Sequence, residues 1–139
     1  MEGTVEYVHL QPGAKPPPLP RAPSRVLVVL STPVEPAWQA RVSTWLIQLG
    51  CLYMLAWGPG CSTWDNSVDT ANGAAFGFGE IPDDAFCMTT WHENESLKEF
   101  MWFAKNCGHH PDVELTRTLL IHIGSVPRPT ELAAAYAEA

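Results

Sequence analysis

The segment RVLVVL (residues 25–30) decides the fold, because it is a short apolar run without polar alternation. Such a run is typical of a strand that is buried on both faces of a sheet. Three later segments give further strands: CLYMLAW (51–57), a strand within DDAFCMTTW (83–91), and TRTLLIHIG (116–124). The sequence therefore predicts at least four strands that share one central sheet.

Helical patterns separate these apolar runs. In residues 36–50, apolar side chains recur at intervals of three and four positions, which places them on one face of a helix. Pro36 suits the first turn of this helix, and Gly50 suits its end. The same reasoning predicts helices over residues 62–72, 94–108 and 130–139.

The alternation of strands and helices predicts parallel strands joined by right-handed crossovers, with helices on both faces of the sheet. We therefore expect an α/β fold, a small doubly wound three-layer sandwich with a mainly parallel sheet of four or five strands. Such a fold is Rossmann-like or flavodoxin-like. An antiparallel α+β arrangement is the main alternative, and the strand order stays open.

The chain divides by composition into two regions. Residues 25–139 hold the alternating elements and form the expected single α/β domain. Residues 1–24 combine TVEYVHL (4–10), whose alternation suits a short edge strand, with a proline-rich leader. Six prolines in residues 11–24 favour an extended polyproline II segment that lies over the domain.

Charge and hydropathy exclude two classes of partner. The 139 residues carry a formal net charge of −7, with 15 acidic and 8 basic side chains. This surface repels phosphate backbones and holds no basic cluster, so we expect no nucleic-acid partner. No segment approaches the roughly 20 apolar residues of a membrane span, so we expect no membrane association.

The cysteines and the amino terminus indicate the compartment. The four cysteines form no C-x-x-C pair, and the first residues lack the pattern of a signal peptide. We therefore expect free thiols in a reducing cytoplasm.

In open parallel sheets, ligands bind beyond the carboxyl ends of the strands. In this sequence the aromatic and polar residues that follow the predicted strands gather at that edge. We expect ligand or partner binding by Trp57, Trp64, Asp65, Thr90, Trp91 and Glu93. The sequence identifies no cofactor and leaves the oligomeric state open.

Cys61 and His92 are the candidate catalytic residues. A thiol at the start of a helix is more easily ionised, and His92 could act as its base, oriented by Glu93 or Asp65. If residues 51–57 and 83–91 form neighbouring strands, their ends lie about 5 Å apart and the pair is feasible. If another strand intervenes, about 10 Å separates them.

A divalent-metal site is a further alternative, formed by His92, Glu93 and Asp65 with Asp69. The spacing of Thr90 and Glu93 also fits a capping box, which explains the carboxylate without a metal, so we predict no metal ligand.

Two other groups of histidines have structural explanations. His109 and His110 follow a predicted helix and suit its terminal carbonyl groups. His122 lies inside a predicted strand and is interpreted as a core histidine whose hydrogen bonds are satisfied.

The segments GCLYMLAWG (50–58), CSTWDNSVD (61–69), IPDDAFCMTTWHENE (81–95) and WFAKN (102–106) resemble a family of small bacterial proteins known as a domain of unknown function. The resemblance extends from about residue 25 to the carboxyl terminus. It implies a stand-alone cytoplasmic protein of bacteria, and it implies no activity or catalytic residue.

The sequence thus favours a non-enzymatic α/β module that binds a partner protein or a small ligand at the carboxyl edge of its sheet. A thiol-dependent hydrolase or transferase that uses Cys61 and His92 is the second hypothesis. A metal enzyme that uses His92, Glu93 and Asp65 is the third.

Overall fold

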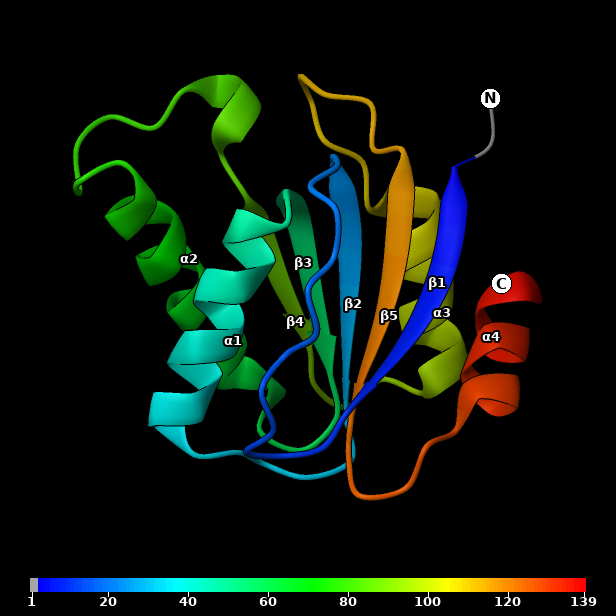
Figure 1. Ribbon diagram of the computed structural model, residues 1–139. Coiled ribbons are helices and arrows are strands. Elements are labelled where there is room, and N and C mark those ends of the chain that lie inside the picture. Colours follow the sequence, from blue (N-terminus) through cyan, green and yellow to red (C-terminus); the bar gives the residue numbers. More distant parts are fainter. Residues whose placement is uncertain (1–2) are drawn as a thin grey trace.

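The computed structural model describes residues 3–139, which form one five-stranded sheet covered by helices on both faces (Figure 1). The strands are β1 (Thr4–Leu10), β2 (Ser24–Leu30), β3 (Cys51–Trp57), β4 (Met88–His92) and β5 (Arg117–Ile123). The helices are α1 (Pro36–Gln48), α2 (Trp64–Ala75), α3 (Leu97–Cys107) and α4 (Pro129–Ala137). Two short 3₁₀ turns, η1 (Cys61–Thr63) and η2 (Asp83–Ala85), precede α2 and β4.

Every strand pair in the sheet is parallel, and the strand order is β1-β5-β2-β3-β4. This arrangement confirms the predicted doubly wound α/β sandwich and excludes the antiparallel alternative. It also fixes the open strand order, because β3 and β4 are direct neighbours.

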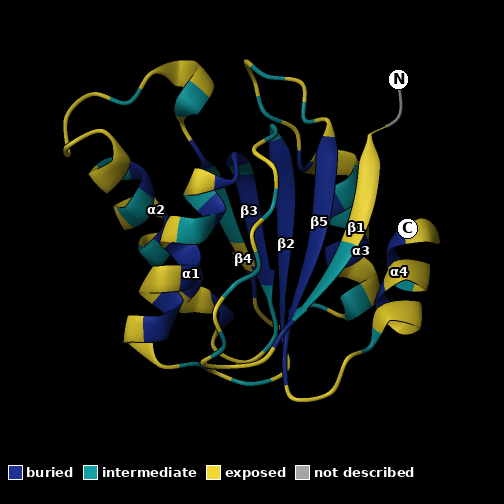
Figure 2. Cartoon of the chain, in the orientation of Figure 1, coloured by how far each residue is buried: buried dark blue, intermediate teal, exposed yellow. Residues whose placement is uncertain are grey.

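Two helices cover each face of the sheet (Figure 1). Val26, Val28 and Leu30 of β2 pack in the core beneath α1 and α2, whereas Leu27 and Val29 pack in the core beneath α3 and α4. All residues of β2 and β5 are buried, and both strands are dark throughout Figure 2. This two-sided burial explains why the sequence of these strands shows no polar alternation.

The edge strand and the proline-rich leader are also ordered. The first half of β1 is exposed, and only its last residue, Leu10, is buried. The leader crosses α1, where the indole nitrogens of Trp38 and Trp45 donate to the carbonyl oxygens of Ala14 and Pro17, at 2.8 and 2.9 Å. These bonds fasten a segment whose prolines have no N–H group to donate.

The start of α3 differs from the prediction by one turn. Asn94 adopts a positive φ of 60°, which interrupts helical geometry, and Ser96 caps the helix. Ser96 Oγ accepts from the Glu99 backbone N–H at 3.1 Å, while the Glu99 carboxylate accepts from the Ser96 backbone N–H at 3.0 Å. The capping box is therefore formed by Ser96 and Glu99, and the predicted pairing of Thr90 with Glu93 is wrong because Thr90 lies in β4.

Candidate functional site

Two places at the carboxyl edge of the sheet have the geometry of a ligand site. At each of them, neighbouring strands lead into helices on opposite faces, which is where ligands bind in open parallel sheets. The central junction is formed by the ends of β5 and β2 with residues 124–128 and 31–35. The lateral junction is formed by the ends of β3 and β4 with residues 58–60 and 93–96.

The lateral junction contains part of the predicted site. Trp57 pairs in register with His92, so the ends of β3 and β4 lie side by side. Beside them lies an open cavity of about 380 Å³. It is lined by Trp57, Gly58, Pro59, Gly60, His92, Glu93, Asn94 and Glu95.

The ring of His92 is held from all sides. Its Nδ1 lies 2.6 Å from Glu95 Oε2, and its Nε2 lies 2.9 Å from Thr90 Oγ1. The rings of Phe100 and Phe103 cover it, with centroids at 5.1 and 4.7 Å. Glu95, and neither Glu93 nor Asp65, therefore orients this histidine, and both ring nitrogens already have partners.

Cys61 does not meet the His92 ring. Its side chain is 2% exposed and packs in the core beneath α1 and α2, whereas the His92 ring packs against α3 on the other face. Burial raises the pKa of the Cys61 thiol, and its contact with the His92 backbone only partly opposes this effect. A protonated thiol on the opposite face from its proposed base lacks the features of an activated nucleophile.

The three tryptophans expected at this edge do not share a surface. Trp57 is half-buried and stacks on Phe100, with ring centroids 6.2 Å apart. Trp64 is fully packed in the core beneath α1 and α2, so it is closed to a ligand. Trp91 is 46% exposed and does not line the cavity.

The carboxylates of the metal hypothesis are dispersed. Asp69 accepts a hydrogen bond from Thr89 Oγ1 at 3.0 Å, and Asp65 lies in the first turn of α2. Within residues 3–139, no three His, Cys, Asp or Glu side chains are arranged to hold a metal ion.

The central junction contains a hydrogen-bonded chain that the sequence did not reveal. Ser31 Oγ lies 2.9 Å from Nε2 of His122, and Nδ1 of the same ring lies 3.0 Å from the hydroxyl of Tyr7. The Tyr7 hydroxyl oxygen also accepts from the backbone N–H of Arg128 at 2.8 Å. An exposed serine, a buried histidine and a fixed tyrosine thus form one continuous chain.

The surroundings of His122 favour the neutral form of its ring. Burial lowers the pKa of His122, and the nearby His9 and Arg128 lower it further, while Glu131 acts in the opposite direction.

The lack of a side chain at Gly124 lets Ser31 approach the His122 ring closely. A Cβ at Gly124 would lie 3.0 Å from Ser31 Oγ and 3.2 Å from His122 Nε2.

The sequence identified His122 as a strand residue, but it did not place Ser31 or Tyr7 beside it. Ser31 and His122 are 91 positions apart, and Tyr7 and His122 are 115 positions apart. They meet because β5 lies between β1 and β2, and Tyr7 is two residues from His9, the partner of His122 in the register. Knowledge of the strand order would have placed these three residues together and identified this site.

Comparison with known proteins shows the family of the chain. Residues 5–139 match the family described as Domain of unknown function (DUF7684), and the chain belongs to this family. No curated protein and no solved structure matches the chain. In the part of the chain that the structure describes, no helix has the length and apolar character needed to cross a bilayer.

Proposed function

We propose that this protein is a serine-dependent hydrolase or acyl transferase that acts on small esters through Ser31. The observation that carries the proposal is the 2.9 Å contact between Oγ of Ser31, an exposed residue, and Nε2 of the buried His122. A nucleophile within hydrogen-bond reach of a base, with the base held by a third group, is the general signature of nucleophilic catalysis.

The Tyr7 hydroxyl can accept a hydrogen bond from the tautomer of His122 that the reaction requires. When His122 carries its proton on Nδ1, that N–H donates to the Tyr7 oxygen, and Nε2 is left to accept the Ser31 proton. The same oxygen accepts from the Arg128 N–H, so both of its lone pairs are used and the phenol is fixed. Because the His122 pKa is lowered, the neutral form that can act as a base is present at neutral pH.

The proposed reaction proceeds in two balanced steps. Ser31 Oγ bonds to the acyl carbon while its proton moves to His122 Nε2, and the ester C–O bond then breaks as that proton passes to the leaving alcohol. A water molecule or an acceptor alcohol next attacks the acyl group on Ser31 and gives its proton to Nε2. Ser31 recovers this proton when the acid or the new ester leaves.

The direct test is hydrolysis of a small activated ester, with Ser31→Ala compared with Ser125→Ala. Ser125 is the matched control, because it is an exposed serine on the neighbouring loop of the same junction. We expect Ser31→Ala to reduce the rate to that of the uncatalysed reaction and Ser125→Ala to leave it unchanged. Equal rates for the wild type and Ser31→Ala would refute the proposal.

Tyr7→Phe tests the role of the third group and keeps the aromatic ring. It removes the oxygen that holds His122 Nδ1, so we expect a loss of roughly three- to tenfold in kcat, as for a misoriented general base. Circular dichroism should show an unchanged fold. A rate equal to that of the wild type would remove Tyr7 from the mechanism.

A second candidate function is supported by the cavity at the lateral junction. Of the described residues that line it, Glu93 and Glu95 carry carboxylates, none is lysine or arginine, and Trp57 supplies an aromatic ring. Carboxylates beside an indole suit an ammonium group, so the ligand would be a small amine. This candidate corresponds to the binding module that the sequence predicted, and it names a small amine as the ligand.

An alkylammonium titration followed by NMR tests this second function. We expect saturable shifts at residues 57–60 and 92–95 that weaken in Glu93→Gln and persist in Glu138→Gln, an exposed glutamate of the carboxyl terminus. Absence of saturable shifts in the wild type would dismiss it.

We also propose that the protein works in a reducing compartment, the cytoplasm. The four cysteines form no C-x-x-C pair, and the sulfurs of Cys51 and Cys87 lie 3.6 Å apart. Such a close pair would be expected to oxidise outside a reducing compartment. Alkylation of freshly lysed cells, followed by mass spectrometry, should find four free thiols; a Cys51–Cys87 disulfide would contradict this assignment.

A further inference from the structure

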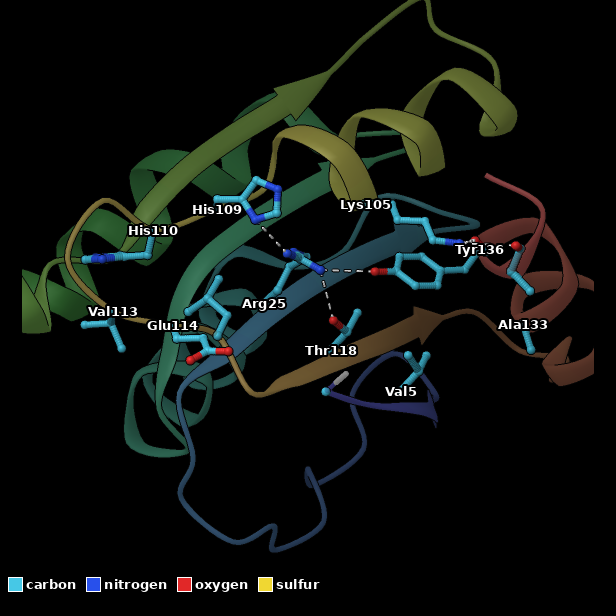
Figure 3. Close-up of a pocket in the computed structure, with 13 residues that line it drawn as sticks. Val5, Arg25, Lys105, His109, His110, Val113, Glu114, Thr118, Ala133 and Tyr136 are labelled. Atoms are coloured by element: carbon cyan, nitrogen blue, oxygen red, sulfur yellow. Dashed lines mark hydrogen bonds between the residues drawn. The ribbon is translucent and has the colours of Figure 1, made fainter. Parts of the chain in front are cut away.

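A cavity lies at the opposite edge of the sheet, beside the amino ends of β2 and β5 (Figure 3). It has a volume of about 890 Å³, within the range of small-molecule sites. Its walls come from β1, β2, β5, α3, α4 and the loop that joins α3 to β5. The cavity is therefore independent of both junctions described above.

A buried cation forms one wall of this cavity. Arg25 is 9% exposed, and Figure 3 shows its guanidinium directed toward His109, Thr118 and Tyr136. Its Nε donates to Gly108 O at 2.7 Å, and its Nη1 donates to Thr118 Oγ1 and Tyr136 Oη at 3.2 and 3.1 Å. Its Nη2 lies 3.4 Å from His109 Nδ1.

These partners position the guanidinium but leave its charge uncompensated. A carbonyl, two hydroxyls and an imidazole nitrogen are neutral acceptors. Within residues 3–139, no carboxylate lies within ion-pair distance of Arg25. Buried charges are normally paired, because their removal from water is costly.

Unused donors remain for a ligand. Arg25 has five N–H groups, of which the contacts above use four, so one stays open on Nη2. Lys105, which also lines the cavity, has three N–H groups and gives two to the carbonyl oxygens of Tyr136 and Ala137, at 3.2 Å each. Glu114 is the one carboxylate among the described lining residues, against two permanent cations.

Arg117 shows the alternative, a buried arginine with a purely structural role. It lies at the same edge of the sheet and is 6% exposed. Its three nitrogens donate to Ser24 Oγ, Pro20 O and Leu49 O, which fastens the leader and the end of α1. Arg117 is not among the residues that line the cavity, whereas Arg25 faces it.

We propose that this cavity binds a small anion, in which a carboxylate or phosphate group is held by Arg25 and Lys105. Arginine suits both groups, because its planar donors match their oxygen atoms. Val5, Val113, Leu115 and Ala133 line the remaining wall and would receive a short apolar body. The site lies away from Ser31, so it would bind an effector or a second ligand.

The test is an NMR titration of the full chain with inorganic phosphate, hexanoate and hexanol at constant ionic strength. We expect saturable shifts at residues 105–118 and 133–137 with one or both anions and none with hexanol. Phosphate alone would identify an inorganic or phosphoryl ligand, and hexanoate alone would identify a carboxylate with an apolar body. Absence of saturation with both anions would overturn the proposal.

Arg25→Met should weaken binding at least about tenfold, because it removes a charged hydrogen bond. Arg41→Met is the control, because Arg41 is an exposed arginine on α1 in the other helix layer. If Arg25→Met does not fold, Lys105→Met is used instead, and it should also weaken binding of the anion. Equal affinity in a folded Arg25 or Lys105 variant would refute the assignment.

Discussion

His92 and His122 occupy equivalent places in the fold, yet their environments differ in one decisive respect. Both lie at the carboxyl edge of the sheet, on the face covered by α3 and α4. Both ring nitrogens of each histidine have side-chain partners. The partners of His92 are a carboxylate and a threonine within its own segment, and two phenylalanines cover its ring. His122 instead has an exposed serine hydroxyl on Nε2.

Carboxylates that are close to a histidine in the sequence therefore do not identify it as a catalytic base. His92 with its following glutamates resembles a site in the sequence, but the glutamate that binds it fixes β4 against the start of α3. His122 has no carboxylate near it in the sequence. Its partners are supplied by β1 and by the residue that follows β2, the two strands beside it.

Substitution of each histidine by glutamine should have the largest effect on ester hydrolysis and separates the roles of the two residues. His122→Gln removes the base, so ester hydrolysis should fall by at least about 100-fold. His92→Gln should leave kcat/KM within about twofold and lower the free energy of unfolding by roughly 1–3 kcal/mol, because it breaks a buried network. Paired kinetics and urea denaturation measure both. A greater kinetic loss in His92→Gln than in His122→Gln would reverse the comparison.

Gly124→Ala tests the contact between Ser31 and His122 while both histidines are retained. The added methyl group would stand 3.0 Å from Ser31 Oγ and 3.2 Å from His122 Nε2, closer than ordinary contact, so the contact between these two groups must shift by a few tenths of an ångström. We expect kcat to fall roughly tenfold, as for a misplaced reacting group. The matched variant Gly77→Ala lies in an open turn far from this junction and should keep full activity, although its positive φ lowers stability. Unchanged kcat in Gly124→Ala would contradict the proposed geometry.

A smaller effect concerns the pH dependence of stability. The pKa of His122 is lowered from its ordinary value of 6.5, so the folded state favours the neutral ring while the unfolded state accepts a proton more readily. The contribution of this residue is complete above pH 6.5 and is lost as the pH falls toward the lowered value. Urea denaturation between pH 5 and 7 should show less pH dependence in His122→Gln than in the wild type. An identical slope would contradict the lowered pKa.

The smallest effect concerns the thiols. Cys107 is the exposed cysteine, whereas Cys61 is buried and its pKa is raised, so iodoacetamide at neutral pH should modify Cys107 first. Cys61→Ala should leave ester hydrolysis unchanged. Peptide mapping after brief alkylation decides the order, and early modification of Cys61 would restore the thiol hypothesis.

The sequence was sufficient for the fold because it carries the burial pattern of each element. RVLVVL is apolar throughout since β2 is covered on both faces, and the α1 stripe follows from one buried helix face. Strand order is not encoded in this way, because a crossover helix can return on either side of a strand. The sequence also does not show on which face of the sheet a side chain lies once its strand has ended. Cys61 therefore proved to lie on the opposite face from the His92 ring.

The most direct measurement is active-site labelling of the wild-type chain with a fluorophosphonate, followed by peptide mapping. We expect a covalent adduct on Ser31 that forms much more slowly in His122→Gln and at the normal rate in His92→Gln. An adduct distributed equally between Ser31 and Ser125, or no adduct on Ser31, would contradict the proposed catalytic serine.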